Sequence, residues 1–206
     1  MIKAEATVVG TVTQSTQIKQ NQKGGYNYIA TVKSAIPMKE GGFKEVSLHV
    51  SAPQEASAGL EKLGTSQHVM LQGTLYFRKD DEQVYLNLSV KAISEIDANL
   101  PDNIAGELTM IGKVGSKGVE VRNSKNGKPV MNFSAYSGDG EDDKRVFTWV
   151  RFVRFSGDVE PFIEPKALIQ ASGDMELQFY KDKLSIGCKL KNVQPYVKKA
   201  PDGAPF

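Results

Sequence analysis

Aromatic and basic side chains alternate along one segment in the second half of the chain, "RVFTWVRFVRF" (residues 145–155). Successive side chains of an extended strand point to opposite sides, so Trp149, Arg151 and Phe155 would share one side. The alternate positions can fill a core: Thr148, Val150 and Phe152. An outward row of two rings and a guanidinium is unfavourable unless a ligand covers it. Bases of single-stranded nucleic acid stack on such rings for about 1–3 kcal/mol each, while arginine holds the phosphates.

A structural alternative exists for the same row, because Trp149 would also fit a core position or a contact between two domains. Further candidates of the same residue types recur on predicted turns of both halves. For any one of them, a solvated turn residue is the ordinary interpretation, but their recurrence at matching places favours a binding groove. They are Arg122, Lys125, Lys128, Tyr136, Phe179 and Tyr180 in the second half, and Tyr26, Tyr28, Tyr76, Arg78 and Lys79 in the first.

The stretch "VEVRNSKNGKPVMNFSAY" (residues 119–136) predicts a β-hairpin, since two alternating runs flank the turn Asn126-Gly127. Its lysines and Arg122 would lie at the groove. Its apolar positions are expected to pack inside: Val119, Val121, Met131 and Phe133.

Catalytic and metal-binding chemistry finds little support in the sequence. The two histidines, His49 and His68, both lie in strand-like runs, where a structural role is usual. Acidic clusters at Lys79–Glu82 and Asp139–Asp143 fall in predicted hairpin loops, and Cys188 lies on the apolar side of a strand. Neither a phosphate-binding loop nor a zinc-ligand spacing is present. We expect a protein that is not an enzyme, with no cofactor and no metal.

The elements that would position these residues form an internal repeat. "VVGTV" (Val8–Val12) corresponds to "MIGKV" (Met110–Val114). Each of the last two predicted strands of the first half lies one hundred positions before its counterpart in the second half. A polar break around Pro101 separates the copies. The sequence predicts a first domain at 1–98, a linker at 99–106, a second domain at 107–197 and a tail at 198–206.

Within each half the apolar residues recur with period two, as in strands. One helical-looking piece per half follows the third strand: "PQEASAGLEKLG" (Pro53–Gly64) and "GDVEPFIEPKA" (Gly157–Ala167). Five strands with a short helix after the third is the order of the oligonucleotide/oligosaccharide-binding (OB) barrel. The predicted fold class is therefore all-β, with two tandem OB barrels.

Composition sets the broad limits. The net charge of +2 is far from the strong positive field of a duplex-DNA binder. No apolar run is long enough for a membrane helix, and the N-terminus lacks a signal-peptide pattern. With a single cysteine, we expect a soluble cytoplasmic protein with no membrane partner.

Three segments resemble the bacterial single-stranded DNA-binding protein family. "GKVGSKGVEVRNSKNGKPVMNFSAY" is similar to its first two strands, "TWVRFVRFSGDVEPF" to its third strand, and "LEKLGTSQHVMLQGTLYFRKD" to a later segment in which Arg78 matches an arginine. The resemblance implies base stacking and backbone contact by Trp149, Arg151 and Phe155. It covers nearly the whole chain, taken twice.

The first half departs from that pattern, because "EVSLHV" (Glu45–Val50) has no aromatic residue where the family has a stacking tryptophan. Family members with two barrels per chain form dimers, so the resemblance implies a homodimer with four barrels. The family's acidic tail ends in Pro-Phe and docks replication and repair proteins. Here Pro205 and Phe206 match that tip on a short spacer, which would suit a compact variant from a phage or mobile element.

The function predicted from the sequence is sequence-independent binding of single-stranded DNA in replication, recombination or repair. One alternative is a tandem-OB adaptor that binds proteins in a replication or conjugation complex. RNA binding is a further alternative, since OB grooves accept both nucleic acids.

Overall fold

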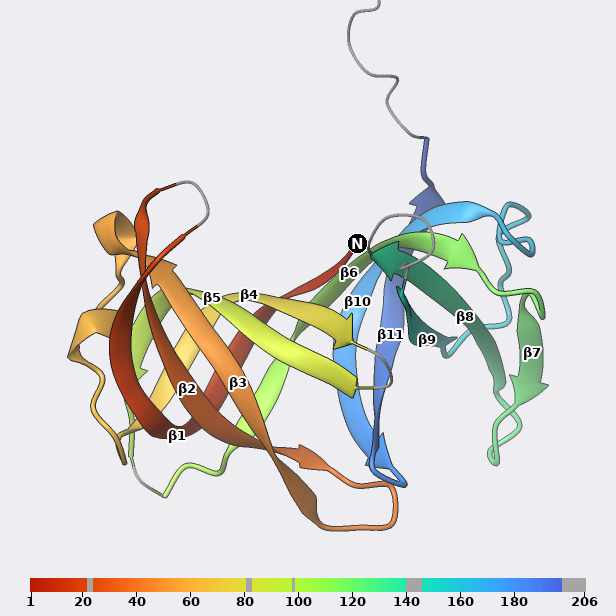
Figure 1. The fold of residues 1–206 in the computed structure, drawn as a ribbon. Coiled ribbons are helices and arrows are strands. Elements are labelled where there is room, and N and C mark those ends of the chain that lie inside the picture. Colours follow the sequence, from red (N-terminus) through yellow and green to blue (C-terminus); the bar gives the residue numbers. More distant parts are fainter. Residues whose placement is uncertain (22–23, 81–82, 98, 140–145, 198–206) are drawn as a thin grey trace, which may run out of the picture.

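A computed structural model describes residues 1–21, 24–80, 83–97, 99–139 and 146–197. Its regular elements are eleven strands and two short 3-10 helices within those ranges (Figure 1). In chain order they are β1 (Ile2–Gln20), β2 (Tyr26–Pro37), β3 (Phe43–Pro53), η1 (Gln54–Ala56), η2 (Leu60–Lys62), β4 (His68–Asp80), β5 (Gln83–Glu95), β6 (Asn103–Val114), β7 (Glu120–Asn123), β8 (Pro129–Asp139), β9 (Val146–Arg154), β10 (Leu168–Tyr180) and β11 (Lys183–Pro195).

The first five strands close into a barrel. β1 pairs with both β2 and β4, β2 pairs with β3, and β4 pairs with β5. A parallel ladder between β3 and β5 completes the ring, which has the strand order of an OB fold. The second half repeats it, with β6 and β7 sharing the role of β1 and a parallel β9–β11 ladder closing the ring. The predicted all-β tandem OB architecture is confirmed.

The predicted offset of one hundred positions is also confirmed, since β4 begins at His68 and β10 at Leu168. The ladder of each strand shifts register at the equivalent glycine, Gly73 or Gly173, where the partner strand has one extra residue, Lys91 or Lys191. A Cβ there would lie 2.1 Å from the Ser89 carbonyl oxygen in the first barrel and 1.9 Å from that of Lys189 in the second. These positions bend the strand so closely over its neighbour that only glycine fits.

The predicted helices are the part of the fold that differs. Residues 53–64 contain two 3-10 turns rather than an α-helix, because Ala58 (φ 52°) and Gly59 (φ 88°) adopt the left-handed conformation between them. Residues 157–167 form turns without a described helix. Pro161 and Pro165 lie one helical turn apart, and each lacks the N–H that a helix interior would need.

An antiparallel ladder between β1 and β6 joins the two barrels into one continuous sheet. β6 begins at Asn103, inside the stretch predicted as linker (99–106). A Cβ at Gly106 would lie 2.3 Å from the Glu5 carbonyl oxygen, so this glycine permits close strand pairing. The first four residues of β6 (103–106) pair with β1 of the first barrel, whereas its ladder with β10 of the second barrel spans Glu107–Lys113. The second part of the predicted linker is therefore a strand between the two barrels.

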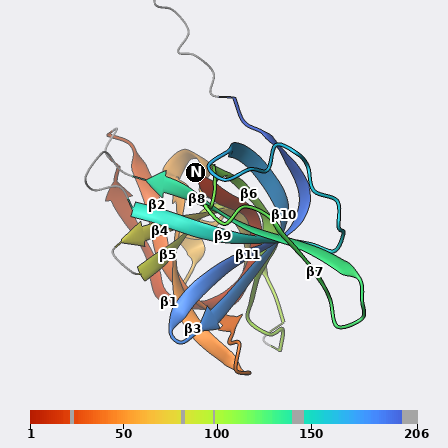
Figure 2. The same cartoon turned by 90° about the vertical axis from the view of Figure 1, so that its right-hand side faces the viewer.

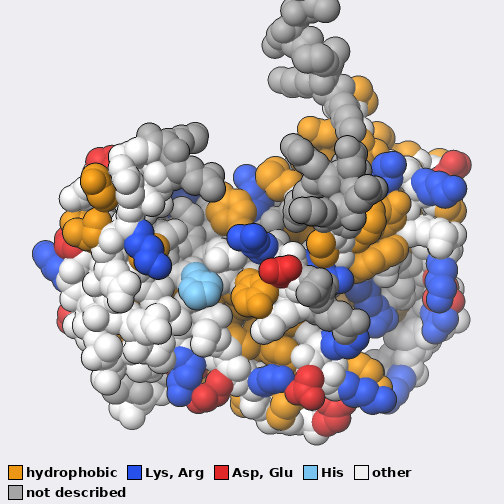
Figure 3. All heavy atoms as spheres, in the orientation of Figure 1, with side chains coloured by type: hydrophobic (Ala, Val, Ile, Leu, Met, Phe, Trp, Pro, Cys, Tyr) orange, Lys and Arg blue, Asp and Glu red, His pale blue; other side chains and the backbone are white. Residues whose placement is uncertain are grey.

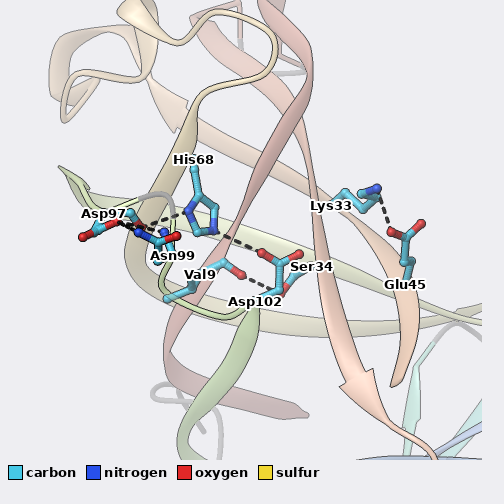
Figure 4. A network of polar contacts seen from close by, with 8 residues as sticks. All are labelled: Val9, Lys33, Ser34, Glu45, His68, Asp97, Asn99 and Asp102. Atoms are coloured by element: carbon cyan, nitrogen blue, oxygen red, sulfur yellow. Dashed lines mark hydrogen bonds and ion pairs between the residues drawn. The ribbon is translucent and has the colours of Figure 1, made fainter. Parts of the chain in front are cut away.

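His68 holds the connection between β5 and β6 in place (Figure 4). Its Nε2 lies 3.1 Å from Asp102 Oδ1, and its Nδ1 lies 3.3 Å from the Asp97 carbonyl oxygen. The Asn99 N–H donates to Asp97 Oδ1 at 2.9 Å, which closes a turn within the connection. The histidine therefore has the structural role that is usual for a strand histidine.

The barrel interiors are filled by the inward positions of each strand. Phe133 and Phe152 stack at 5.0 Å between ring centroids, Met131 is fully buried, and Val119 packs partly against this core. Val121, predicted to be inside, is 45% exposed, because β7 pairs only with β8 and projects beyond the barrel (Figure 2). Cys188 is buried as predicted, and burial raises the pKa of its thiol to about 12.

No helix in the described ranges is long and apolar enough to cross a membrane.

Candidate nucleic-acid interface

The alternation predicted for the third strand of the second barrel is confirmed in β9. Trp149 is 49% exposed and Phe155 is 70% exposed, and the Arg151 side chain is also exposed. The inward positions Thr148, Val150 and Phe152 are buried. The exposure of Trp149 excludes the core position considered from the sequence. Trp149 also borders a small hollow that is lined by residues of both barrels.

Trp149 belongs to an aromatic cluster in which the half-buried ring of Tyr136 contacts the exposed rings of Trp149 and Phe147. Tyr136 lies directly opposite it in the β8–β9 register, and the two ring centroids are 4.8 Å apart. Phe147 packs edge-on against Tyr136 at 5.3 Å. Phe147 was not singled out from the sequence, although it lies two positions before Trp149 and the same alternation places it on the same side. The cluster offers several ring surfaces on one sheet face.

A groove of about 640 Å³ begins at this cluster and runs along the second barrel. We call it the Trp149 groove; it is lined by Gly115, Ser116, Lys117, Gly118, Glu120, Arg122, Asn132, Phe133, Ser134, Trp149 and Arg151. The wall between β6 and β7 approaches the indole closely, since a Cβ at Gly115 would lie 3.1 Å from Trp149 Cζ3. Gly115 is fixed there by its N–H, which donates to the Ser134 carbonyl at 2.8 Å.

The charged groups of the Trp149 groove are mainly basic. Arg151 Nη2 lies 3.4 Å from Asn132 Oδ1, and Lys117, which was not predicted, lies on the opposite wall. Arg122 is paired with Glu120, with 2.5 Å between Nη2 and Oε1. Three cations and one carboxylate thus line the groove, and the carboxylate partly neutralises one of the cations.

Two lysines predicted at the groove, Lys125 and Lys128, do not line it. Both are exposed at the turn of the projecting β7–β8 hairpin, where the Lys128 N–H donates to Ser124 Oγ at 3.1 Å. They can reach only a ligand that extends beyond the groove along this hairpin (Figure 2).

Phe155 is positioned by the loop that follows β9. Arg154 binds Glu160 through two contacts, at 2.6 Å from Nη1 to Oε1 and 2.8 Å from Nη2 to Oε2. The guanidinium lowers the pKa of Glu160, and the carboxylate raises the pKa of Arg154. The loop is thereby tied to the strand end, with Phe155 exposed beside it but outside the groove lining.

The first barrel lacks the aromatic cluster. Leu48 pairs with Leu86 in the β3–β5 ladder as Val150 pairs with Ile186 in the β9–β11 ladder, which makes Leu48 the counterpart of Val150. Ser47 therefore occupies the place of Trp149, and His49 the place of Arg151.

A surface ion pair, Lys33 Nζ to Glu45 Oε1 at 2.7 Å, lies on this same face (Figure 4). The face of β3 that carries "EVSLHV" therefore has charged and small polar side chains where the equivalent face of β9 has Trp149 and Arg151.

The other candidates from the first half are dispersed. Tyr26 is exposed and Tyr28 half-buried in β2, next to β1 and away from the groove lining. Tyr76 and Arg78 lie on the exposed side of β4. Only Lys79 reaches the aromatic cluster, where its Nζ donates to the Phe147 carbonyl at 3.3 Å.

Phe179, predicted as a groove residue, is buried. It is 9% exposed and continues the inward alternation of β10. Its neighbour Tyr180 is exposed, with Lys39 Nζ 4.6 Å and Lys181 Nζ 5.5 Å from the ring centroid. Both residues lie at the junction with the first barrel rather than in the Trp149 groove. Pro205, Phe206 and residues 140–143 of one acidic cluster lie outside the described residues.

No family model and no curated protein sequence matches the chain. Among solved structures, the wild-type single-stranded DNA binding protein from Thermus aquaticus is similar over 98% of this chain and 96% of its own, with 11% identity and a TM-score of 0.47. The small single-stranded DNA-binding protein from Streptomyces coelicolor is similar over 46% of this chain and 92% of its own (16% identity, TM-score 0.36).

The protein priB from Ralstonia solanacearum is similar over 45% of this chain and 98% of its own (13% identity, TM-score 0.35). Identities and TM-scores this low assign no activity to the chain, which has to be inferred from its own groove.

Proposed function

We propose that the chain binds single-stranded DNA, without sequence preference, in the Trp149 groove of the second barrel. The observation that carries the proposal is the cluster of the exposed rings of Phe147 and Trp149 with the half-buried ring of Tyr136, beside the exposed side chain of Arg151. Unstacked bases lie on exposed rings, and guanidinium groups follow the phosphates. Every base has a ring face, so stacking of this kind tolerates any sequence.

Single strands fit this arrangement better than a duplex. In a duplex the base faces are covered by their neighbours, so the rings of the cluster would meet only edges and backbone. The net charge of +2 also supplies too weak a field for binding that relies on phosphates alone. We therefore place the chain among binding proteins rather than enzymes.

The biological role that follows is the coating of single-stranded intermediates in replication, recombination or repair. This role rests on the sequence resemblance, as do a homodimer with four barrels, a cytoplasmic location and docking of partner proteins by Pro205 and Phe206. Each can be examined once DNA binding has been measured, the homodimer by analytical ultracentrifugation of the full chain.

The test of the proposal is a fluorescence titration, because Trp149 is the sole tryptophan and lies in the groove. Oligo-dT should quench its emission, and the affinity should fall by about 0.7 log units per log unit of salt for each phosphate neutralised. A duplex of the same length should bind more weakly. Absence of both quenching and salt-sensitive binding would contradict the proposal.

A second candidate function, a protein-binding adaptor, is favoured by one observation. The first barrel has Ser47 and His49 where the second has Trp149 and Arg151. The β3 face of the first barrel therefore has no ring for bases to stack on at the place of Trp149. An adaptor would give no quenching with oligo-dT or oligo-U, whereas an RNA-binding protein would prefer oligo-U of equal length.

A further inference from the structure

Residues at one end of each barrel contact the other barrel across the space between them. Lys79, near the end of β4, reaches β9, where its Nζ donates to the Phe147 carbonyl. In return, the tip of β10–β11 reaches the β2–β3 end of the first barrel, where the Lys39 N–H donates to the Phe179 carbonyl at 2.8 Å. Lys44 Nζ also binds Asp182 Oδ1 at 2.7 Å. These contacts fix the walls of a cleft that both halves build.

Two adjoining hollows make up this inter-barrel cleft. The smaller, about 210 Å³, is lined by Lys79, Val84, Phe147, Thr148, Trp149, Lys183, Leu184 and Ile186. The larger, about 630 Å³, is lined by Lys44, Glu45, Val46, Ser47, His49, Gln83, Val84, Tyr85, Leu86, Phe179, Lys181, Asp182, Lys183 and Leu184. The hollows share Val84, Lys183 and Leu184, so they are neighbours.

The inter-barrel cleft adjoins the Trp149 groove at one side chain, because Trp149 lines both the groove and the smaller hollow. The three hollows therefore form one series, from Arg122 on the second barrel to His49 on the first. Figure 3 shows Lys and Arg side chains and hydrophobic side chains gathered over the middle of this face, between the barrels.

The lining of the inter-barrel cleft has the chemistry of the groove. Four lysines face two carboxylates, and each carboxylate is in an ion pair, Glu45 with Lys33 and Asp182 with Lys44. Tyr85 supplies an exposed ring, and Val84 and Leu184 supply half-buried apolar surface. Rings, apolar surface and an excess of lysine along an open series of hollows suit a linear polyanion with flat bases better than a compact ligand.

We propose that a single strand held at Trp149 continues through the inter-barrel cleft onto the first barrel, so that both halves bind one strand as a single site. This inference rests on the proposed function of the Trp149 groove. It gives the aromatic-poor first half a role, since that half contributes Tyr85, His49 and Lys44 at the cleft in place of a second aromatic cluster.

The experiment compares two lengths of oligo-dT on the full chain. One of about 8 nucleotides can be covered by one OB barrel, whose range is about 4–16 nucleotides, and one of about 25 nucleotides must extend further. The test variant is Tyr85→Ala with Lys181→Gln. The matched control is Tyr26→Ala with Lys19→Gln, which removes an exposed tyrosine and an exposed lysine from the β1–β2 hairpin.

The cleft variant should weaken binding of the long oligonucleotide about tenfold and leave the short one unchanged, while the control variant changes neither. Equal weakening of both lengths, or no change in the long one, would overturn the inference while leaving the Trp149 groove in place. Failure of the proposed function gives a different result, in which Trp149→Ala leaves the binding of both lengths unchanged, and it would remove the starting point of the path.

Photo-crosslinking gives an independent readout of the path. A long oligo-dT with 5-iodouracil at one end, then at the other, should crosslink at Tyr85 or His49 from one of the two ends. Crosslinks confined to the second barrel from both ends would overturn the inference.

Discussion

Glu5 lies directly opposite Glu107 in the β1–β6 ladder, and the two residues occupy equivalent positions of the repeat. The equivalence follows from the neighbouring ladders: Val8 pairs with Leu71, and Met110 pairs with Ala171, the counterpart of Leu71. Val8 and Met110 are therefore equivalent, and so are Glu5 and Glu107 at the same spacing. An approximate two-fold axis therefore passes between the two glutamates, and the ladder is the joint between the two copies.

The two halves neutralise this joint differently. Glu5 binds Lys91 Nζ at 2.7 Å and accepts a hydrogen bond from Thr74 Oγ1 at 2.9 Å, and Lys91 lowers the pKa of Glu5. In the second half, the equivalent Lys191 instead binds Asp174 at 2.5 Å. The same divergence occurs in the grooves, where only one copy keeps the aromatic cluster. A duplicated fold can thus retain its joint while its two faces specialise.

Replacing Trp149 by Ala should weaken binding of oligo-dT about tenfold or more, because stacking on one ring contributes about 1–3 kcal/mol. The control is Tyr26→Ala, which removes an exposed ring that lines neither the groove nor the cleft. Fluorescence anisotropy of a labelled oligonucleotide measures both, since the variant lacks its tryptophan. Equal effects of the two substitutions would show that the Trp149 groove has no special role.

The fold could be predicted from the sequence because period-two alternation and a constant offset depend on local pattern and length. The offset of one hundred positions between β4 and β10, and the outward row on β9, both follow from such patterns. The predicted helical piece of the first half is present as two short 3-10 helices, interrupted by the left-handed residues Ala58 and Gly59, and that of the second half has no described helix.

The candidate site was predicted less completely. Trp149 and Arg151 follow from strand alternation, and Tyr136 from its place in the hairpin. Phe179 is buried and Tyr180 is exposed, because neighbouring residues of a strand face opposite sides of the sheet and Phe179 falls on the inward side of β10. Lys117 lines the groove because the turn that carries it is bound to β8 through the Gly115 N–H and the Ser134 carbonyl. The inter-barrel cleft depends on how β6 pairs with β1. Both are long-range contacts that periodicity does not report.

Replacing Glu120 by Gln should tighten binding about two- to threefold at low salt. Glu120 is paired with Arg122 inside the groove, so its charge competes with phosphate for the guanidinium and also repels the strand. Glu95→Gln removes the same charge from the far end of β5 and serves as the control. The gain should shrink as salt screens the charges, and anisotropy titrations at two salt concentrations measure it. Weaker binding by Glu120→Gln would contradict a phosphate-binding role for Arg122.

Replacing Gly106 by Ala should lower the free energy of unfolding by about 1–3 kcal/mol, because the new Cβ would meet the Glu5 carbonyl oxygen and the Ala6 Cα of the joining ladder. The control is Gly64→Ala, whose Cβ would meet nothing closer than 4.0 Å, and which should change stability by less than about 0.5 kcal/mol. Urea denaturation measures both variants. An unchanged midpoint for Gly106→Ala would mean that the β1–β6 ladder is not a tight joint in solution.

Replacing Glu160 by Gln should lower the free energy of unfolding by about 1 kcal/mol at pH 7 and reduce its dependence on pH in acid. Arg154 lowers the pKa of Glu160, so the folded protein holds this proton less tightly than the unfolded chain does. The stabilisation is therefore fully present above the ordinary glutamate pKa of about 4.3 and is lost as the pH falls through the lower folded value.

Urea midpoints between about pH 3 and pH 7 measure this effect, with Glu164→Gln as the control because it removes a carboxylate from the same loop without removing a partner of Arg154. The wild type and the control should lose stability in parallel toward acid, and Glu160→Gln should lose less. Arg154 also anchors the loop beside Phe155, which lies outside the groove lining. Glu160→Gln should therefore weaken the binding of long oligo-dT only slightly at pH 7. If all three proteins showed the same acid slope, the Arg154–Glu160 pair would not be formed in the folded state.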